Sequence, residues 1–111
     1  MKRLILAAAL LPVPAFADAT SMCLDRPNMT DDVCACATDA LALAVSEEDR
    51  ALYDAIGTLY LPEKAAGTPF ADAWDMAVDA VAAENGTTRS ALQRKMNPVG
   101  RAHRDAIEAC E

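Results

Sequence analysis

Apolar residues recur every three or four positions along most of this chain, which is the spacing of one buried face of a helix. After Thr30, these positions are Val33, Ala37, Ala40, Leu41 and Ala44. They predict a helix over about 31–45, because Thr30 can cap its start and two aspartates follow at the positive end of the helix dipole. No segment of the sequence alternates apolar and polar residues as a half-buried strand does.

The same periodicity predicts further helices, with a capping residue, a glycine or a proline at each boundary. Their expected ranges are about 46–61, 69–84, 88–96 and 99–110. Pro62 is expected to end the second helix and Pro98 to separate the last two, because proline lacks the N–H that a helix interior needs. The predicted fold is all-α, a compact irregular bundle of four to five short helices.

The first residues differ from the rest and predict a cleaved signal peptide. The basic pair Lys2-Arg3 precedes an apolar run, which ends at the small-x-small cleavage site Ala15-Phe16-Ala17. We therefore expect residues 1–17 to be removed and residues 18–111 to form a single helical domain. The run is too short to cross a membrane and no later segment reaches about 18 apolar residues, so the mature chain is expected to have no transmembrane segment.

The net charge narrows the classes of partner. The chain has 17 acidic and 10 basic residues, and loss of Lys2 and Arg3 leaves 17 acids against 8 bases, a net charge of −9. Such a charge disfavours nucleic acid or an anionic membrane surface as a partner. It is compatible with a basic protein partner, and also with a role in solubility alone.

All four cysteines, Cys23, Cys34, Cys36 and Cys110, lie in the part expected to be exported. An even number in a small exported chain predicts two disulfides. Successive helical residues turn by about 100°, so Cys34 and Cys36 point about 200° apart and are poorly placed to bond to each other. The pairing Cys23–Cys34 with Cys36–Cys110 is slightly favoured over the crossed one, and its two loops would contribute about 3 and about 4.5 kcal/mol.

Soft-metal handling is the first alternative interpretation of these cysteines. Cys23, Cys34 and Cys36, together with Met22, Met29 and His103, are soft or borderline donors of the kind that copper(I) prefers. Against this hypothesis, the sequence has no Cys-x-x-Cys or His-x-x-x-His spacing, and an oxidising compartment removes thiolates. The missing Cys-x-x-Cys also disfavours a redox role. His103 lies among charged residues and is predicted to be an exposed helical residue.

The sequence predicts no catalytic activity and no cofactor. It contains no Gly-x-Ser-x-Gly, no His-Glu-x-x-His and no glycine-rich phosphate loop. Asp72, Asp75 and Asp79 share one helix face, which we interpret as a solvated face. The aromatic residues of the mature part have aliphatic neighbours and are predicted to pack in the core; they are Tyr53, Tyr60, Phe70 and Trp74.

Together these features predict a small exported, disulfide-stabilised, non-enzymatic binding or accessory protein with an acidic surface. The high alanine content and short signal peptide are typical of bacteria, so the expected location is the periplasm, with the extracellular space as the alternative. In size and composition the chain is similar to small periplasmic acid-stress chaperones, although no motif is shared. That resemblance implies a periplasmic stress chaperone as a second alternative function.

Overall fold

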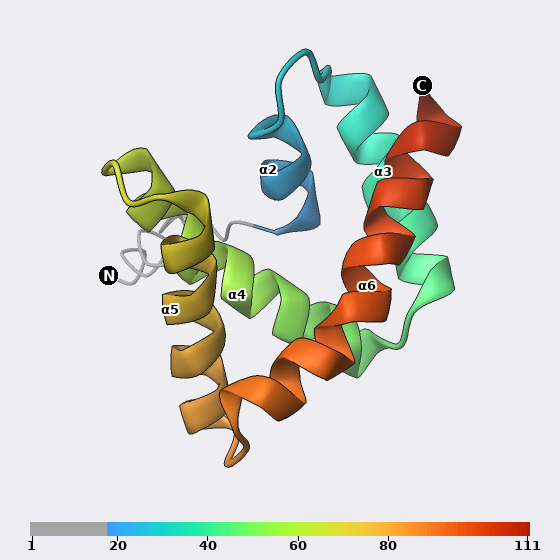
Figure 1. Cartoon of the computed structure of the whole chain (residues 1–111). Coiled ribbons are helices and arrows are strands. Elements are labelled where there is room, and N and C mark those ends of the chain that lie inside the picture. The colour runs from blue at the N-terminus through green and yellow to red at the C-terminus, as the bar shows by residue number, and fades with distance from the viewer. Residues whose placement is uncertain (1–17) are drawn as a thin grey trace, which may run out of the picture.

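The computed structural model of the chain describes residues 18–111, and the predicted signal peptide lies outside the described residues. Within this range the chain forms helices and no strand, so the prediction of an all-α fold is confirmed (Figure 1). The helices are α2 (Ala19–Leu24), α3 (Asp31–Ala44), α4 (Glu47–Ala65), α5 (Phe70–Glu84) and α6 (Arg89–Cys110).

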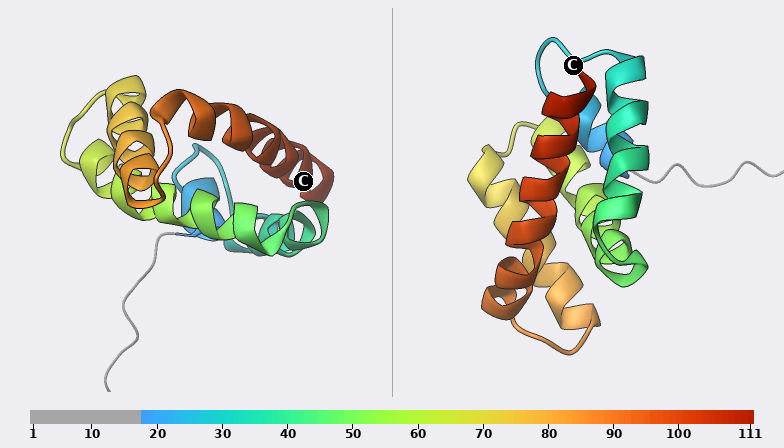
Figure 2. Two further views of the ribbon diagram at one scale, coloured as in Figure 1. Left: turned by 90° about the horizontal axis from the view of Figure 1, so that it is seen from below. Right: turned by 90° about the vertical axis from the view of Figure 1, so that its right-hand side faces the viewer.

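Helices far apart in the sequence pack side by side. The C-terminal half of α6 lies along α3, and α5 packs against α4 (Figure 1). The short α2 lies between α3 and α4 and contacts both. Figure 2 shows that the C-terminus comes to the same end of the molecule as the loop between α2 and α3.

Three helix starts have the side-chain caps that the sequence predicts. The hydroxyl oxygens of Thr30, Ser46 and Thr88 accept hydrogen bonds from the third N–H group that follows each, at 3.2, 3.1 and 3.1 Å. These bonds satisfy donors that have no partner within the helix. The start of α5 differs from the prediction, because Pro69 is the N-cap rather than the first helical residue and forms no side-chain cap.

Two glycines end α4 and α5. Gly67 and Gly86 have φ angles of +105° and +67°, a left-handed conformation that other residues adopt at a cost. The residue after each glycine then donates its N–H to the carbonyl five positions earlier, with Thr68 bonded to Glu63 and Thr87 to Ala82. This arrangement satisfies carbonyls at the helix ends and turns the chain back on itself.

Both proline predictions are wrong, because α4 continues through Pro62 and α6 through Pro98. A proline inside a helix removes one backbone hydrogen bond, and packing of the flanking turns can offset that loss. In α6 the buried residues on the two sides of Pro98 form one continuous face: Leu92, Met96, Val99, His103, Ala106 and Ile107. Figure 1 shows α6 changing direction in its first half, as expected of a proline-containing helix.

The sequence did not predict α2, whose six residues are too few to show a helical period. The Asp18 carboxylate caps it by accepting the N–H of Ser21 at 3.1 Å. Asp54 on α4 accepts the N–H of Ala19 at the same distance. Met22 and Cys23 are buried, so contacts with the rest of the fold hold this helix in place.

The buried side chains form two clusters. The main core lies among α4, α5 and α6 and also takes in residues of α2 and α3, and its fully buried members include Leu41, Ile56, Val78, Val81, Leu92, Met96 and Val99. The second cluster joins α2, α3 and the end of α6, and consists of Cys23, Cys34, Ala37, Ala106 and Ile107. Two of the cysteines therefore belong to the apolar interior.

Candidate functional site

The four cysteines form two pairs at bonding distance. The sulfur atoms are 2.09 Å apart in Cys23–Cys34 and 2.00 Å apart in Cys36–Cys110. Cys34 is fully buried and Cys36 is exposed, so the two leave different sides of α3. The prediction that two disulfides hold the bundle together is confirmed, and the pairing is the one that the sequence slightly favours. Disulfides indicate an oxidising compartment outside the cytoplasm.

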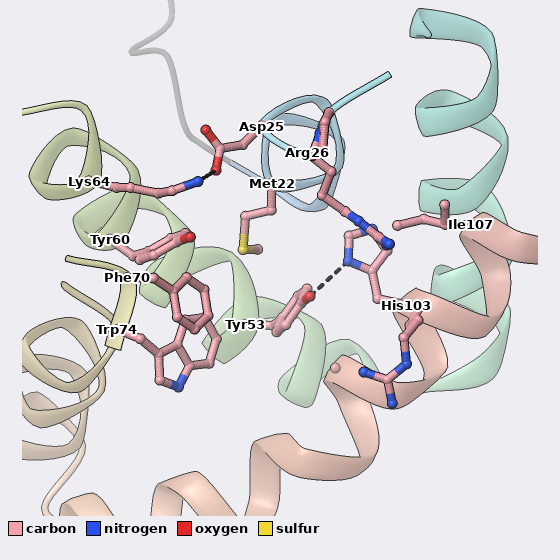
Figure 3. A pocket seen from close by; sticks show the side chains of 13 residues that line it. Met22, Asp25, Arg26, Tyr53, Tyr60, Lys64, Phe70, Trp74, His103 and Ile107 are labelled. Atoms are coloured by element: carbon pink, nitrogen blue, oxygen red, sulfur yellow. Dashed lines mark hydrogen bonds and ion pairs between the residues drawn. The ribbon is translucent and has the colours of Figure 1, made fainter. Parts of the chain in front are cut away.

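A pocket of about 430 Å³ opens between α2, α4, α5 and α6 (Figure 3). Its size is in the range of about 300–1,000 Å³ that is typical of small-molecule sites. We call it the aromatic pocket, and its main lining residues are Met22, Arg26, Tyr53, Tyr60, Phe70, Trp74, His103 and Arg104. The sequence did not predict it, since these residues come from four separate segments.

Tyr53 and His103 form the floor of the aromatic pocket. The Tyr53 hydroxyl lies 2.7 Å from Nδ1 of His103, and the two rings meet edge to face with centroids 5.5 Å apart. His103 is only 4% exposed, so the prediction of an exposed histidine is wrong. Its position continues the buried face of α6 at helical spacing, and the charged neighbours Arg104 and Asp105 point outward.

Burial keeps both floor groups neutral near pH 7. Desolvation, followed by the charge of Asp54, raises the pKa of Tyr53 to about 12. Desolvation, followed by the charge of Arg26, lowers the pKa of His103. We assign the Tyr53 hydroxyl as donor to Nδ1, which leaves the ring proton on Nε2. That Nε2 is buried and has no hydrogen-bond partner within residues 18–111.

Acidification is expected to destabilise the fold through His103. Its pKa is lower in the folded protein than the ordinary 6.5, so the unfolded chain binds the proton more readily. The contribution of neutral His103 to the free energy of unfolding is fully present above the ordinary pKa of 6.5. It starts to be lost as the pH falls below 6.5, and it is gone below the pKa that His103 has in the folded protein. Urea unfolding between about pH 7.5 and about pH 5 should show a steeper loss for the wild type than for His103→Gln, which cannot titrate. Parallel pH profiles would contradict this prediction.

Positive charge surrounds the mouth of the aromatic pocket. Lys64 is paired with Asp25, whereas Arg26 and Arg104 form no ion pair with any residue from 18 to 111. Both arginines are exposed residues. The helix that carries Arg104 is also rich in basic residues, in contrast to the acidic chain as a whole; they are Arg89, Arg94, Lys95, Arg101 and Arg104. Of these only Arg104 lines the pocket, which Arg26 and Lys64 also line together with one acid, Asp25. The pocket therefore carries a net positive charge on a negatively charged protein.

Three aromatic rings form one wall of the pocket (Figure 3). Tyr60 meets Phe70 and Trp74 edge to face, with centroids 5.6 Å away in both cases, and Phe70 stacks on Trp74 at 6.5 Å. Tyr53 and Tyr60 are buried as predicted and Trp74 is half-buried. Phe70 is 60% exposed, so its predicted place in the core is wrong. The Trp74 indole donates its N–H to Gln93 at 2.8 Å, which fixes the ring.

The acidic and soft-donor residues that the sequence singled out do not gather into one site. Asp72, Asp75 and Asp79 are all exposed on α5, as expected of a solvated face, and Asp75 lies 3.7 Å from Arg89. In the described part of the chain, no three His, Cys, Asp or Glu residues are arranged to hold a metal ion. Every cysteine there is bonded to another.

The fold and the pocket together define a disulfide-linked helical domain with an electropositive aromatic pocket. None of the described helices combines the length and the apolar character needed to cross a membrane. Comparison with known proteins gives no relative, because no protein-family model, curated protein or solved structure matches the chain.

Proposed function

We propose that the mature protein is a non-enzymatic binding protein of the periplasm, and that it holds a small ligand in the aromatic pocket. The observation that carries this proposal is the pocket itself, where exposed Phe70, two unpaired arginines and a buried unpartnered ring nitrogen meet. Apolar walls with a few convergent polar groups are typical of ligand sites. Export is supported by the signal-like residues 1–17 and by the two disulfides.

Trp74 offers a direct test, because it is the only tryptophan of the chain and it lines the pocket. The low-molecular-weight fraction of a periplasmic extract should shift its emission in a saturable way. Gly100 also lines the pocket, and an added Cβ there meets no other atom within 4 Å. Gly100→Leu should reduce the response by filling space, and Gly100→Ala should keep it. Absence of a saturable response in the wild type would refute the binding function.

A basic protein partner is the second candidate function, because α3 and α5 carry acidic residues and no basic one. Their acidic residues, all exposed, are Asp31, Asp32, Asp39, Asp72, Asp75, Asp79 and Glu84. A partner held by these charges should be captured at low salt and released at high salt. Asp72→Asn/Asp79→Asn should weaken capture, and salt-independent capture would count against this candidate.

The two other functions that the sequence raised stay predictions. Copper or other soft-metal handling requires thiolates, and the two disulfides leave Met22, Met29 and His103 as soft donors. Thiol counting on the exported protein tests the metal-handling hypothesis, since free cysteines would support it. An acid-stress chaperone should suppress aggregation of client proteins at low pH. The lowered pKa of His103 supports that alternative to the extent that it weakens the fold on acidification.

A further inference from the structure

We propose that the aromatic pocket binds a small carboxylate with an aromatic body. This inference rests on the binding function proposed above and adds the chemical class of the ligand. It is drawn from three features of the pocket, namely its unpaired arginines, its unpartnered floor nitrogen and its partly exposed wall of rings.

The charge at the mouth selects an anion. Arg26 follows α2 and Arg104 lies on α6, and both line the pocket. The charges of both act on the pKa of the Tyr53 hydroxyl at the floor, where the opposite effect of Asp54 is larger. Both arginines thus line one pocket, and within residues 18–111 no carboxylate of the protein pairs with either. A guanidinium matches a carboxylate through two parallel hydrogen bonds. The two arginines therefore supply a place for a ligand carboxylate.

The floor adds a donor beside the arginines. His103 is 4% exposed, and its Nε2 has no hydrogen-bond partner in the described structure. A buried polar group without a partner destabilises the folded protein, and a ligand that displaces the side chains covering Nε2 and accepts its hydrogen bond removes that cost. Figure 3 shows Arg26 extending from the end of α2 toward His103. A carboxylate held by Arg26 would therefore be in the part of the pocket that His103 also lines.

The three aromatic rings on one wall of the pocket determine the chemical nature of the uncharged part of the ligand. Phe70 is 60% exposed although it packs against two other rings, so a large apolar surface faces the opening of the pocket. Aromatic pairs gain binding energy beyond the area that they bury. A ring in the ligand can add to the Tyr60, Phe70 and Trp74 cluster while its carboxylate reaches the arginines. An inorganic anion would leave this wall uncovered.

The test uses 3-phenylpropionate as the probe, with two matched compounds, and measures dissociation constants from Trp74 emission and by calorimetry. The neutral amide 3-phenylpropionamide should bind at least about tenfold more weakly, because it lacks the charge that strengthens hydrogen bonds to arginine. The saturated acid 3-cyclohexylpropionate should also bind more weakly than 3-phenylpropionate, because it lacks the aromatic ring. Equal binding of the acid and its amide would overturn the assignment of a carboxylate, and equal binding of the two acids would overturn the aromatic body.

Variants locate the site. Arg26→Gln and Arg104→Gln should each weaken 3-phenylpropionate about tenfold and leave the amide almost unchanged. Arg94→Gln is the matched control, since Arg94 is exposed on α6 and does not line the pocket. Phe70→Ser should weaken the acid and the amide alike.

The two proposals fail in different ways. If Arg26→Gln and Arg104→Gln behave like Arg94→Gln, the anion site is wrong even where the probe binds. If no probe binds but the periplasmic fraction still shifts Trp74 emission, the ligand class is wrong and the binding function stands. If neither the probes nor the periplasmic fraction give a response, both proposals are wrong.

Discussion

Replacing Cys110 with serine is expected to lower the free energy of unfolding by about 2–5 kcal/mol. Cys110 is the last residue of α6, and its bond to Cys36 joins positions 74 residues apart. A cross-link over so long a loop restricts the unfolded chain strongly, and on the chain-entropy account it contributes about 4.5 kcal/mol. Loss of the bond should also release the end of α6 from α3. Urea unfolding of the oxidised protein measures the change.

The matching substitution on α3 provides the control for this prediction. Cys36→Ser breaks the same bond from the other side, so it should cost as much as Cys110→Ser, and the double variant should cost little more than either. Additive losses would show that the two cysteines do not act as a pair. Hydrogen exchange should show faster exchange at the end of α6 in all three variants, with α5 unchanged.

The Cys23–Cys34 disulfide is expected to contribute more to the free energy of unfolding than its loop length indicates. Cys23 and Cys34 are only 11 residues apart, and the sequence alone predicts a smaller loss for Cys23→Ser than for Cys110→Ser. In the structure both residues are fully buried in the second cluster. Serine there would place hydroxyls in an apolar interior, which adds a desolvation cost to the lost cross-link.

Leu41→Ala is the second substitution with a large expected effect, a loss of about 2–5 kcal/mol. Leu41 is completely buried on α3 and belongs to the main core, so truncation removes apolar contacts and leaves a cavity. Leu43 is the matched control because it lies on the same helix and is 91% exposed. Leu43→Ala should change the stability by no more than about 0.5 kcal/mol. Similar losses for the two variants would mean that the buried face of α3 is not the one that carries Leu41.

Most of the fold could be predicted from the sequence because its helices carry local signals. Capping hydroxyls such as Thr30, Ser46 and Thr88 satisfy the first N–H groups of a helix, and this local effect is visible without knowledge of the fold. The opposite sides taken by Cys34 and Cys36 follow from helix geometry alone. In each case the determining interaction spans only a few residues.

The features that were predicted wrongly from the sequence have a common cause, which is packing between distant segments of the chain. Pro98 breaks a local rule, yet Met96 before it and Val99 after it are buried against the rest of the bundle and the helix continues. His103 has charged neighbours in the sequence, but its own position falls on the buried face. Phe70 begins α5 and remains at the surface, although its hydrophobicity favours the core. The aromatic pocket escaped prediction for the same reason, since Arg26, Tyr53 and His103 meet only in the folded protein.

Native mass spectrometry of unreduced protein released from the periplasm tests the central claim most directly. An exported, oxidised binding protein should have the mass of residues 18–111 less the hydrogens lost in two disulfides. It should also carry a small molecule that is released when the protein is denatured. Peptide mapping of the same sample should recover Cys23 joined to Cys34 and Cys36 joined to Cys110. A chain that keeps residues 1–17 or carries four free thiols, or a correctly processed chain without any bound molecule, would contradict the account.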